Sequence, residues 1–94
     1  MRVRWTRRAL QSLDSIAEYI ARDRPGAAAR MVERIDDAVG LLARYPEMGR
    51  PGRVPGTREL IVSGSPYIVP YRLRGEEVEI ITVLHAARLW PDRF

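Results

Sequence analysis

Two stretches in the first half of the chain carry apolar residues at helical spacing. Residues 3–5 alternate apolar and polar side chains, as an edge strand does, and Thr6 after them has the side chain of a helix N-cap. The helix predicted over residues 7–22 has an apolar stripe formed by Leu10, Leu13, Ile16, Ala17 and Ile20. The helix predicted over residues 25–44 has an apolar side formed by Ala28, Met31, Val32, Ile35, Ala38, Val39 and Leu42. Pro25 suits the first turn of this second helix, and the short link predicts an antiparallel helical hairpin.

The composition changes abruptly after the second helix. Residues 46–56 contain three prolines and three glycines, which predicts a loop without regular structure. Three strands are predicted after this loop, over residues 57–62, 67–73 and 78–84, with turns at residues 63–66 and 74–76. The last strand is mostly apolar, so we expect it to be central and buried, whereas Pro70 in the middle strand predicts a bulge or an unpaired edge. In the tail, residues 86–89 have the composition of one helical turn before Pro91.

The predicted order of elements is β-α-α-β-β-β, within a single domain over residues 1–94. A helical hairpin of this kind needs one face of a sheet to pack on. The predicted fold class is therefore α+β, with the antiparallel helical hairpin packed on one face of a small, mainly antiparallel sheet. The opposite face of the sheet stays open, and on a basic protein it is the natural binding surface.

Composition excludes several kinds of site and leaves the partner open. The chain has no cysteine and one histidine, so disulfides are excluded, and neither a metal nor another cofactor is expected. Its apolar runs are far shorter than the roughly 18 residues of a membrane span, and its N-terminus lacks the apolar core of a signal peptide. We therefore expect a cytoplasmic protein without a membrane partner. The net charge of +4 favours an anionic partner. All sixteen basic residues are arginines, which suit phosphates and carboxylates but which a GC-rich genome also produces.

Four short segments of the chain are informative when they are taken together and in their order along the sequence. The first is Trp5-Thr6 with Ala9-Leu10, Leu13 and Ile16-Ala17-Glu18-Tyr19-Ile20, and the second is Pro46-Glu47-Met48-Gly49-Arg50-Pro51. The third joins Thr57-Arg58-Glu59-Leu60 to Pro66-Tyr67-Ile68-Val69 and Tyr71-Arg72, and the fourth joins Val83-Leu84-His85-Ala86-Ala87-Arg88 to Trp90-Pro91. No segment is specific alone. Together, over about residues 3–91, they resemble toxins of the RelE/ParE family.

The resemblance implies the toxin of a type II toxin–antitoxin system of the plasmid-stabilisation kind. Such a toxin is neutralised by a cognate antitoxin, here expected to be ParD-like or RelB-like. We expect the antitoxin to bind through a segment that carries acidic and apolar side chains. The family contains two activities: ParE-like members poison DNA gyrase, and RelE-like members cut mRNA on the ribosome.

The positions matched to the RelE-like catalytic set favour the gyrase activity. Attack by a ribose 2′-hydroxyl needs a group that activates it, charge stabilisation for the phosphorane and an acid for the leaving oxygen. RelE-like members use lysines, arginines and a late tyrosine, whereas here Glu59 and Ile61 occupy the lysine positions and Ile68 an arginine position. Arg88 matches a basic residue, and the tyrosine has no counterpart beyond Phe94, which lacks the hydroxyl. The sequence is therefore interpreted as closer to ParE, with no firm catalytic residue.

Two alternatives stay open beside a gyrase poison. The first is a ribosome-dependent mRNA endoribonuclease with a different acid–base set, formed by Arg58, Arg72, His85 and Arg88. His85 is otherwise a packed histidine that closes the last strand, and Arg72 is otherwise a partner of Glu79 across the hairpin. The second is a basic nucleic-acid-binding module of the double-stranded-RNA kind, which is disfavoured because both helices precede the β-hairpin pair.

Five further residues are candidates for contacts with a partner: Arg50, Arg53, Tyr67, Tyr71 and Trp90. The two arginines lie in the Pro/Gly loop, and loops carry a large share of functional residues. The two tyrosines are four residues apart on one strand, so they point to the same face and serve sheet packing before binding. Trp90 is a packing residue before it is a stacking platform.

Overall fold

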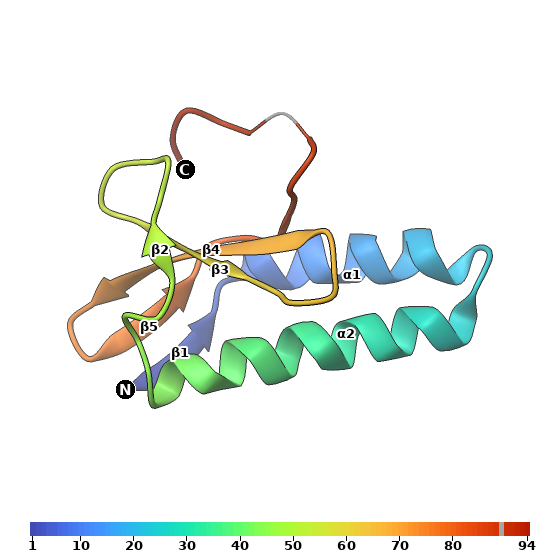
Figure 1. Ribbon diagram of the computed structural model, residues 1–94, viewed down its shortest axis with the longest axis horizontal. Coiled ribbons are helices and arrows are strands. Elements are labelled where there is room, and N and C mark those ends of the chain that lie inside the picture. Colours follow the sequence, from blue (N-terminus) through green and yellow to red (C-terminus); the bar gives the residue numbers. More distant parts are fainter. Residues whose placement is uncertain (89) are drawn as a thin grey trace.

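Two helices cover one face of a six-stranded sheet in the computed structural model, which describes residues 1–88 and 90–94 (Figure 1). The helices are α1 (Arg7–Ala21) and α2 (Pro25–Gly40), and a 3-10 turn, η1 (Leu41–Ala43), continues α2. The strands are β1 (Arg2–Trp5), β2 (Arg50–Pro51), β3 (Arg58–Ile61), β4 (Tyr67–Arg74), β5 (Glu77–Ile80) and β6 (Leu84–His85). The predicted α+β class and the helical hairpin are confirmed.

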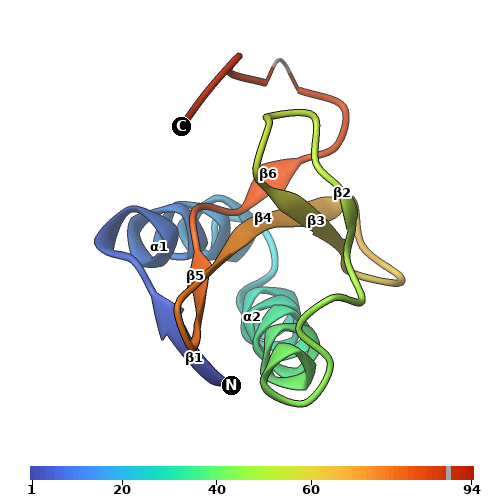
Figure 2. The same ribbon diagram turned by 90° about the vertical axis from the view of Figure 1, so that its left-hand side faces the viewer.

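The strands follow the order β1-β5-β4-β3-β2, and β6 pairs with β4 beyond the end of β5. β1 runs parallel to β5, and the other pairs are antiparallel, so the sheet is mainly antiparallel as predicted. β1 lies at the edge and β5 lies inside, as expected. Side chains of both helices pack in one core against the same face of the strands, which leaves the other face of the sheet open; Figure 2 shows the strands in their order from β1 to β2.

α1 begins at a residue that is also bonded to the sheet. The Thr6 hydroxyl accepts a hydrogen bond from the Ala9 N–H at 3.1 Å and donates one to the Ile80 carbonyl at 2.7 Å. The first bond is that of the predicted N-cap. The second joins the start of the helix to the end of β5, so it fixes the position of α1 on the sheet.

Ala9, and not Leu10, faces the core in the first turn of α1. Ala9 is fully buried, whereas Leu10 is 48% exposed, so the prediction that Leu10 belongs to the core stripe is wrong. The bond between Thr6 and the Ile80 carbonyl holds the first turn close to the strands, where only a small side chain fits. Further along the helix the predicted stripe holds, since Leu13 and Ile16 pack against the core.

α2 supplies the helical half of the core. Pro25 is its first residue, as predicted, and Ile35 and Val39 on its inner side are at most 1% exposed, as is Leu42 in η1. They pack against side chains of the covered face, which include Leu60, Val69, Tyr71, Val78 and Ile80 of the strands and Val62 just after β3. The two apolar layers exclude water between the hairpin and the sheet, which is the main source of stability in a domain of this size.

The structure differs from the predicted strands at two places. Residues 46–56 were expected to lack regular structure, but Arg50 and Pro51 form β2 and pair with Glu59 and Arg58. The single strand predicted over residues 78–84 is split, because β5 ends at Ile80 and pairing resumes in β6. In both cases the pairing partner is a neighbouring strand, β3 for β2 and β4 for β5 and β6.

Pro70 explains the interruption between β5 and β6. Tyr71 pairs with Ile80 and Ile68 pairs with Leu84, so two residues of β4 face three residues of the opposite chain. This is a β-bulge, as predicted at Pro70. The Pro70 carbonyl accepts a hydrogen bond from Ile81 at 3.0 Å, but proline has no N–H to return.

The chain after β6 forms a turn and then crosses the open side of the sheet (Figure 1). The Arg88 N–H donates to the His85 carbonyl at 3.1 Å, so residues 85–88 form a hydrogen-bonded turn instead of the predicted helical turn. Leu89, the last residue of that prediction, lies outside the described residues. Across the ranges 1–88 and 90–94, neither helix is both long and apolar enough to span a membrane.

Candidate partner-binding surfaces

The open face of the sheet carries an ion-pair network centred on Glu79. Arg72 lies opposite Glu79 in the β4–β5 ladder, and its Nε donates to the Glu79 carboxylate at 2.8 Å. Arg4 from β1 binds the same carboxylate, and Arg74 approaches it to 3.7 Å. The hydrogen bond from Arg72 is the main cause that holds the pKa of Glu79 below its ordinary value, against the effect of burial. Arg72 is therefore engaged by a carboxylate, which is one of the two roles considered for it.

Glu59 organises the Pro/Gly loop from the same face. Its carboxylate is 2% exposed and accepts hydrogen bonds from Arg50 Nε at 3.0 Å and Arg50 Nη2 at 2.9 Å. The other carboxylate oxygen accepts the backbone N–H of Arg53 at 2.8 Å. Glu59 thus holds β2 and the loop after it against β3. The glutamate at a position matched to a catalytic lysine therefore has a structural role.

Tyr71 fastens the beginning of the same loop from the covered face. Its side chain is fully buried, and its hydroxyl donates to the Pro46 carbonyl at 2.7 Å and accepts from the Gly49 N–H at 2.9 Å. Burial is the main cause that raises the pKa of Tyr71. Arg58 donates to the Gly49 carbonyl at 2.9 Å and to the Glu47 carbonyl at 3.1 Å. Tyr71 and Arg58 are therefore bound within the chain.

The four residues considered as an acid–base set do not form one cluster. Arg72 lies on the open face with Glu79, and Arg58 binds carbonyls of the loop after η1. His85 and Arg88 lie together in a groove beside α1. The geometry brings together one imidazole and one guanidinium, and leaves the other two arginines at separate sites.

The groove lies between α1 and the chain from β6 to Arg88, with a volume of about 530 Å³. Tyr67 is 7% exposed and forms part of this groove, where its ring meets the His85 ring edge-on at 5.7 Å between centroids. Burial raises the pKa of Tyr67, and the positive charge of Arg88 partly opposes this. The His85 Nδ1 accepts the Ala87 N–H at 3.1 Å, so the neutral imidazole carries its proton on Nε2.

The tail is held over the open side of the sheet by its aromatic residues. The Trp90 Nε1 donates to the His85 carbonyl at 3.3 Å, and the Arg53 guanidinium lies 3.8 Å from the centre of the Trp90 ring. Arg8 at the start of α1 lies 5.4 Å from the centre of the Phe94 ring. Cation–π contacts of this kind are attractive. They join the tail to the Pro/Gly loop and to α1.

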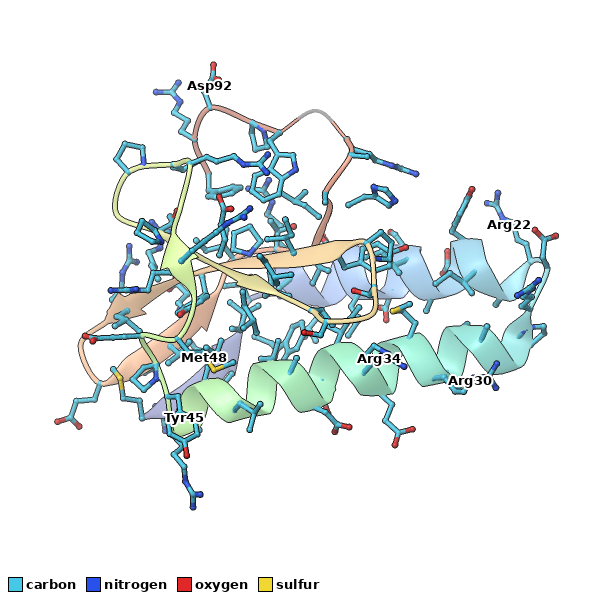
Figure 3. The ribbon with its side chains drawn as sticks, in the orientation of Figure 1. Arg22, Arg30, Arg34, Tyr45, Met48 and Asp92 are labelled. Atoms are coloured by element: carbon cyan, nitrogen blue, oxygen red, sulfur yellow. The ribbon has the colours of Figure 1, made fainter. Side chains whose placement is uncertain are left out.

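The α1 side of the groove was not predicted from the sequence. Four polar residues of that side follow one another at spacings of three and four: Ser12, Ser15, Tyr19 and Arg22. This spacing marks one face of a helix and was available in the sequence. Tyr19 is 61% exposed, and Figure 3 shows Arg22 at the far end of α1. Within the described residues no group of three histidine or acidic side chains is suited to a metal ion.

Comparisons with known proteins agree along nearly the whole chain. The family described as "ParE toxin of type II toxin-antitoxin system, parDE" matches residues 3–90. A protein of Sinorhizobium fredii, named as toxin Y4kP, is 57% identical over 97% of this chain and 94% of its own length. Toxin RelE2 of Caulobacter vibrioides is 44% identical over 90% of this chain and 94% of its own length.

Solved structures of both branches share the fold. The chromosomal ParDE toxin–antitoxin system from P. aeruginosa matches with a TM-score of 0.84 and 32% identity, covering 90% of this chain and 95% of the other. The toxin–antitoxin complex RelBE2 from Mycobacterium tuberculosis matches with a TM-score of 0.61 and 29% identity, covering 89% and 95%. The fold, the ordered segments and these relatives agree, so the chain belongs to the RelE/ParE family and is the toxin of a type II toxin–antitoxin system.

Proposed function

We propose that this toxin poisons DNA gyrase by protein–protein contact, in the cytoplasm, and that a cognate antitoxin neutralises it. The proposal rests on one observation about Glu59. This residue occupies a position where RelE-like members have a catalytic lysine, and its side chain is 2% exposed in an ion pair with Arg50. A carboxylate repels the phosphate of an RNA substrate. Ile61 and Ile68, at two further matched positions, offer no charge to a phosphorane.

The similarities to known proteins also support a ParE-like activity. The matching family is that of ParE toxins, and the ParDE system from P. aeruginosa has the higher TM-score of the two structures, 0.84 against 0.61. A gyrase poison needs a binding surface and no assembled acid–base set. This requirement fits a molecule in which Arg58 and Arg72 are bound within the chain.

The second candidate function is ribosome-dependent mRNA cleavage. One observation favours it: His85 and Arg88 line the same groove, so an acid–base group and a cation are close together. The 44% identity to a protein named RelE2 points the same way. A two-residue set of this kind acts in the groove beside α1, which is a different place from the open face of the sheet.

A pair of reactions with one toxin preparation tests the proposal. In the first, toxin is incubated with DNA gyrase, ATP and supercoiled plasmid, and linear DNA released by detergent and protease is measured. In the second, toxin is added to a reconstituted translation reaction, and mRNA ends are mapped by primer extension. The cognate antitoxin is added to matched samples of both, because a specific effect must disappear with it.

We expect linear DNA in the first reaction and intact mRNA in the second. Cut mRNA without linear DNA overturns the gyrase proposal and supports the second candidate. His85→Gln separates the candidates further, because it removes the imidazole. Under the second candidate His85→Gln abolishes mRNA cleavage, whereas gyrase poisoning needs no proton transfer.

A further inference from the structure

One groove of the molecule contains polar groups that the fold does not use. It is the groove beside α1, and its volume of about 530 Å³ lies within the range of about 300–1,000 Å³ that is usual for ligand sites. The Tyr67 hydroxyl and the guanidinium groups of Arg22 and Arg88 line it. Over residues 1–88 and 90–94, these three groups make no internal side-chain hydrogen bond or ion pair. They are therefore available to a ligand.

The rest of the sheet surface contrasts with this groove. Six arginines bind glutamates of the chain itself: Arg2, Arg4, Arg50, Arg53, Arg72 and Arg74. Each of these guanidinium groups already has a carboxylate partner, although the six arginines share three glutamates, Glu59, Glu77 and Glu79. In the groove, Arg22 and Arg88 are accompanied by a single acidic residue, Glu18, which ion-pairs with neither of them among the described side chains. The groove is thus a place where uncompensated positive charge adjoins a concave surface.

The floor of the groove is apolar. Ile16 of α1, Leu84 of β6 and the ring of Tyr67 supply the apolar lining and are partly or fully buried, whereas Arg22 and Arg88 of the same lining are exposed. A segment that places one apolar side chain on this floor brings its neighbouring carboxylates within reach of the guanidinium groups. Arginine binds carboxylates strongly because its planar fork offers two parallel N–H donors.

We infer that this groove binds a carboxylate-bearing segment of the cognate antitoxin, with an apolar side chain on the floor and Arg22 and Arg88 bound to its carboxylates. The inference rests on the antitoxin part of the proposed function and not on the identity of the target. Two observations select this occupant: the groove is complementary in charge to an acidic segment, and the chain is a toxin whose structural relatives belong to toxin–antitoxin systems.

The absence of cysteine from the chain makes the location directly measurable. Ser15→Cys places one reactive thiol at the groove, and Ala29→Cys places one on an exposed position of α2. Each variant is labelled with an environment-sensitive fluorophore and titrated with the purified antitoxin. We expect a saturable fluorescence change at position 15 and little change at position 29. Binding reported equally by both labels, or by the α2 label alone, overturns the assignment.

Affinity measurements test the charged residues themselves. Calorimetric titration compares wild type with Arg88→Ala, Arg22→Ala and the double variant, and Arg30→Ala is the matched control because Arg30 is an exposed arginine of α2 (Figure 3). Loss of a charge-assisted contact should raise Kd about tenfold or more for each groove variant and leave the control within about twofold. The salt dependence of Kd should also become weaker in the double variant. Unchanged thermal unfolding shows that the variants are folded.

Equal affinities for the groove variants and the Arg30→Ala control would overturn the proposal. So would a groove variant that binds the antitoxin normally but no longer poisons gyrase, because the groove would then belong to the target. Failure of the gyrase proposal has a different signature. In that case the wild-type toxin yields no linear DNA, while Arg22→Ala and Arg88→Ala still weaken antitoxin binding.

Discussion

Replacing Tyr71 with phenylalanine removes a hydroxyl that joins the loop after η1 to β4. The hydroxyl donates to the Pro46 carbonyl at 2.7 Å and accepts from the Gly49 N–H at 2.9 Å. Phenylalanine fills the same space in the core, where Tyr71 is fully buried. The substitution therefore leaves apolar packing in place and isolates the contribution of these two hydrogen bonds.

The expected loss is about 2–4 kcal/mol in the free energy of unfolding. The lost bond to the Pro46 carbonyl is worth about 1 kcal/mol net, and the Gly49 N–H left without an acceptor costs about 1–3 kcal/mol. Gly49 is buried, so its N–H cannot turn to water, whereas the half-buried Pro46 can rehydrate its carbonyl. In a domain of this size the loss lowers Tm by roughly 8–30 °C, at about 4–8 °C per kcal/mol.

Equilibrium unfolding in urea, followed by far-UV circular dichroism, measures this loss. Tyr45→Phe is the matched control, because Tyr45 is 53% exposed and its hydroxyl makes no hydrogen bond within the described residues (Figure 3). The control should change stability by less than about 0.5 kcal/mol. A loss below about 1 kcal/mol for Tyr71→Phe would refute the conclusion that the hydroxyl fastens the loop, since a single exposed hydrogen bond is worth that much.

Three further predictions concern the charged residues. Glu59→Lys places an ammonium group against Arg50 and Arg53, so it should destabilise the fold by about 2–4 kcal/mol. It should create no mRNA cleavage, although it restores a lysine at the matched position. A variant as stable in urea as the wild type would contradict the structural role of Glu59. The ionised form of Glu79 stabilises the fold above the ordinary carboxyl pKa of 4.5, and this stabilisation is lost as the pH falls through the lowered pKa of the folded state. Urea midpoints measured from neutral to acidic pH should therefore fall less steeply for Glu79→Gln than for wild type, and identical profiles exclude the assignment. Arg53→Ala removes the cation from the Trp90 ring, so trypsin should cut the tail faster than in wild type; an unchanged rate shows that the contact does not hold the tail.

Local chemistry was sufficient to predict much of the fold. The N-cap at Thr6 and the bulge at Pro70 each follow from properties of one residue, a hydroxyl that accepts a helix N–H and a missing N–H in a ladder. The helical spacing in α2 predicted Ile35 and Val39 as core residues because burial follows periodicity wherever a helix has a single covered side. These features do not depend on which distant segment packs against them.

Other features depend on contacts with segments outside the element itself and were therefore hidden. β2 exists because Glu59 binds Arg50 across the ladder, and nothing within the loop itself indicates a strand. Leu10 is exposed because the bond from Thr6 to the Ile80 carbonyl sets the rotation of α1. The groove combines positions of α1 with the chain after β5, so its polar lining forms only when the helix and the sheet meet.

The arginine content of the chain has a structural explanation that changes its functional meaning. One oxygen of Glu59, Oε1, accepts two N–H bonds from the Arg50 guanidinium, and Glu79 is bound by three arginines from β1 and β4. A planar fork can share a nearly buried carboxylate in this way, whereas an ammonium group offers a single point charge. The arginines over the open face therefore already have carboxylate partners, with six arginines sharing three glutamates, and a net charge of +4 says little about where an anion binds. The informative arginines are those left without a carboxylate beside a concave apolar surface, and by this criterion Arg22 and Arg88 direct attention to the groove beside α1.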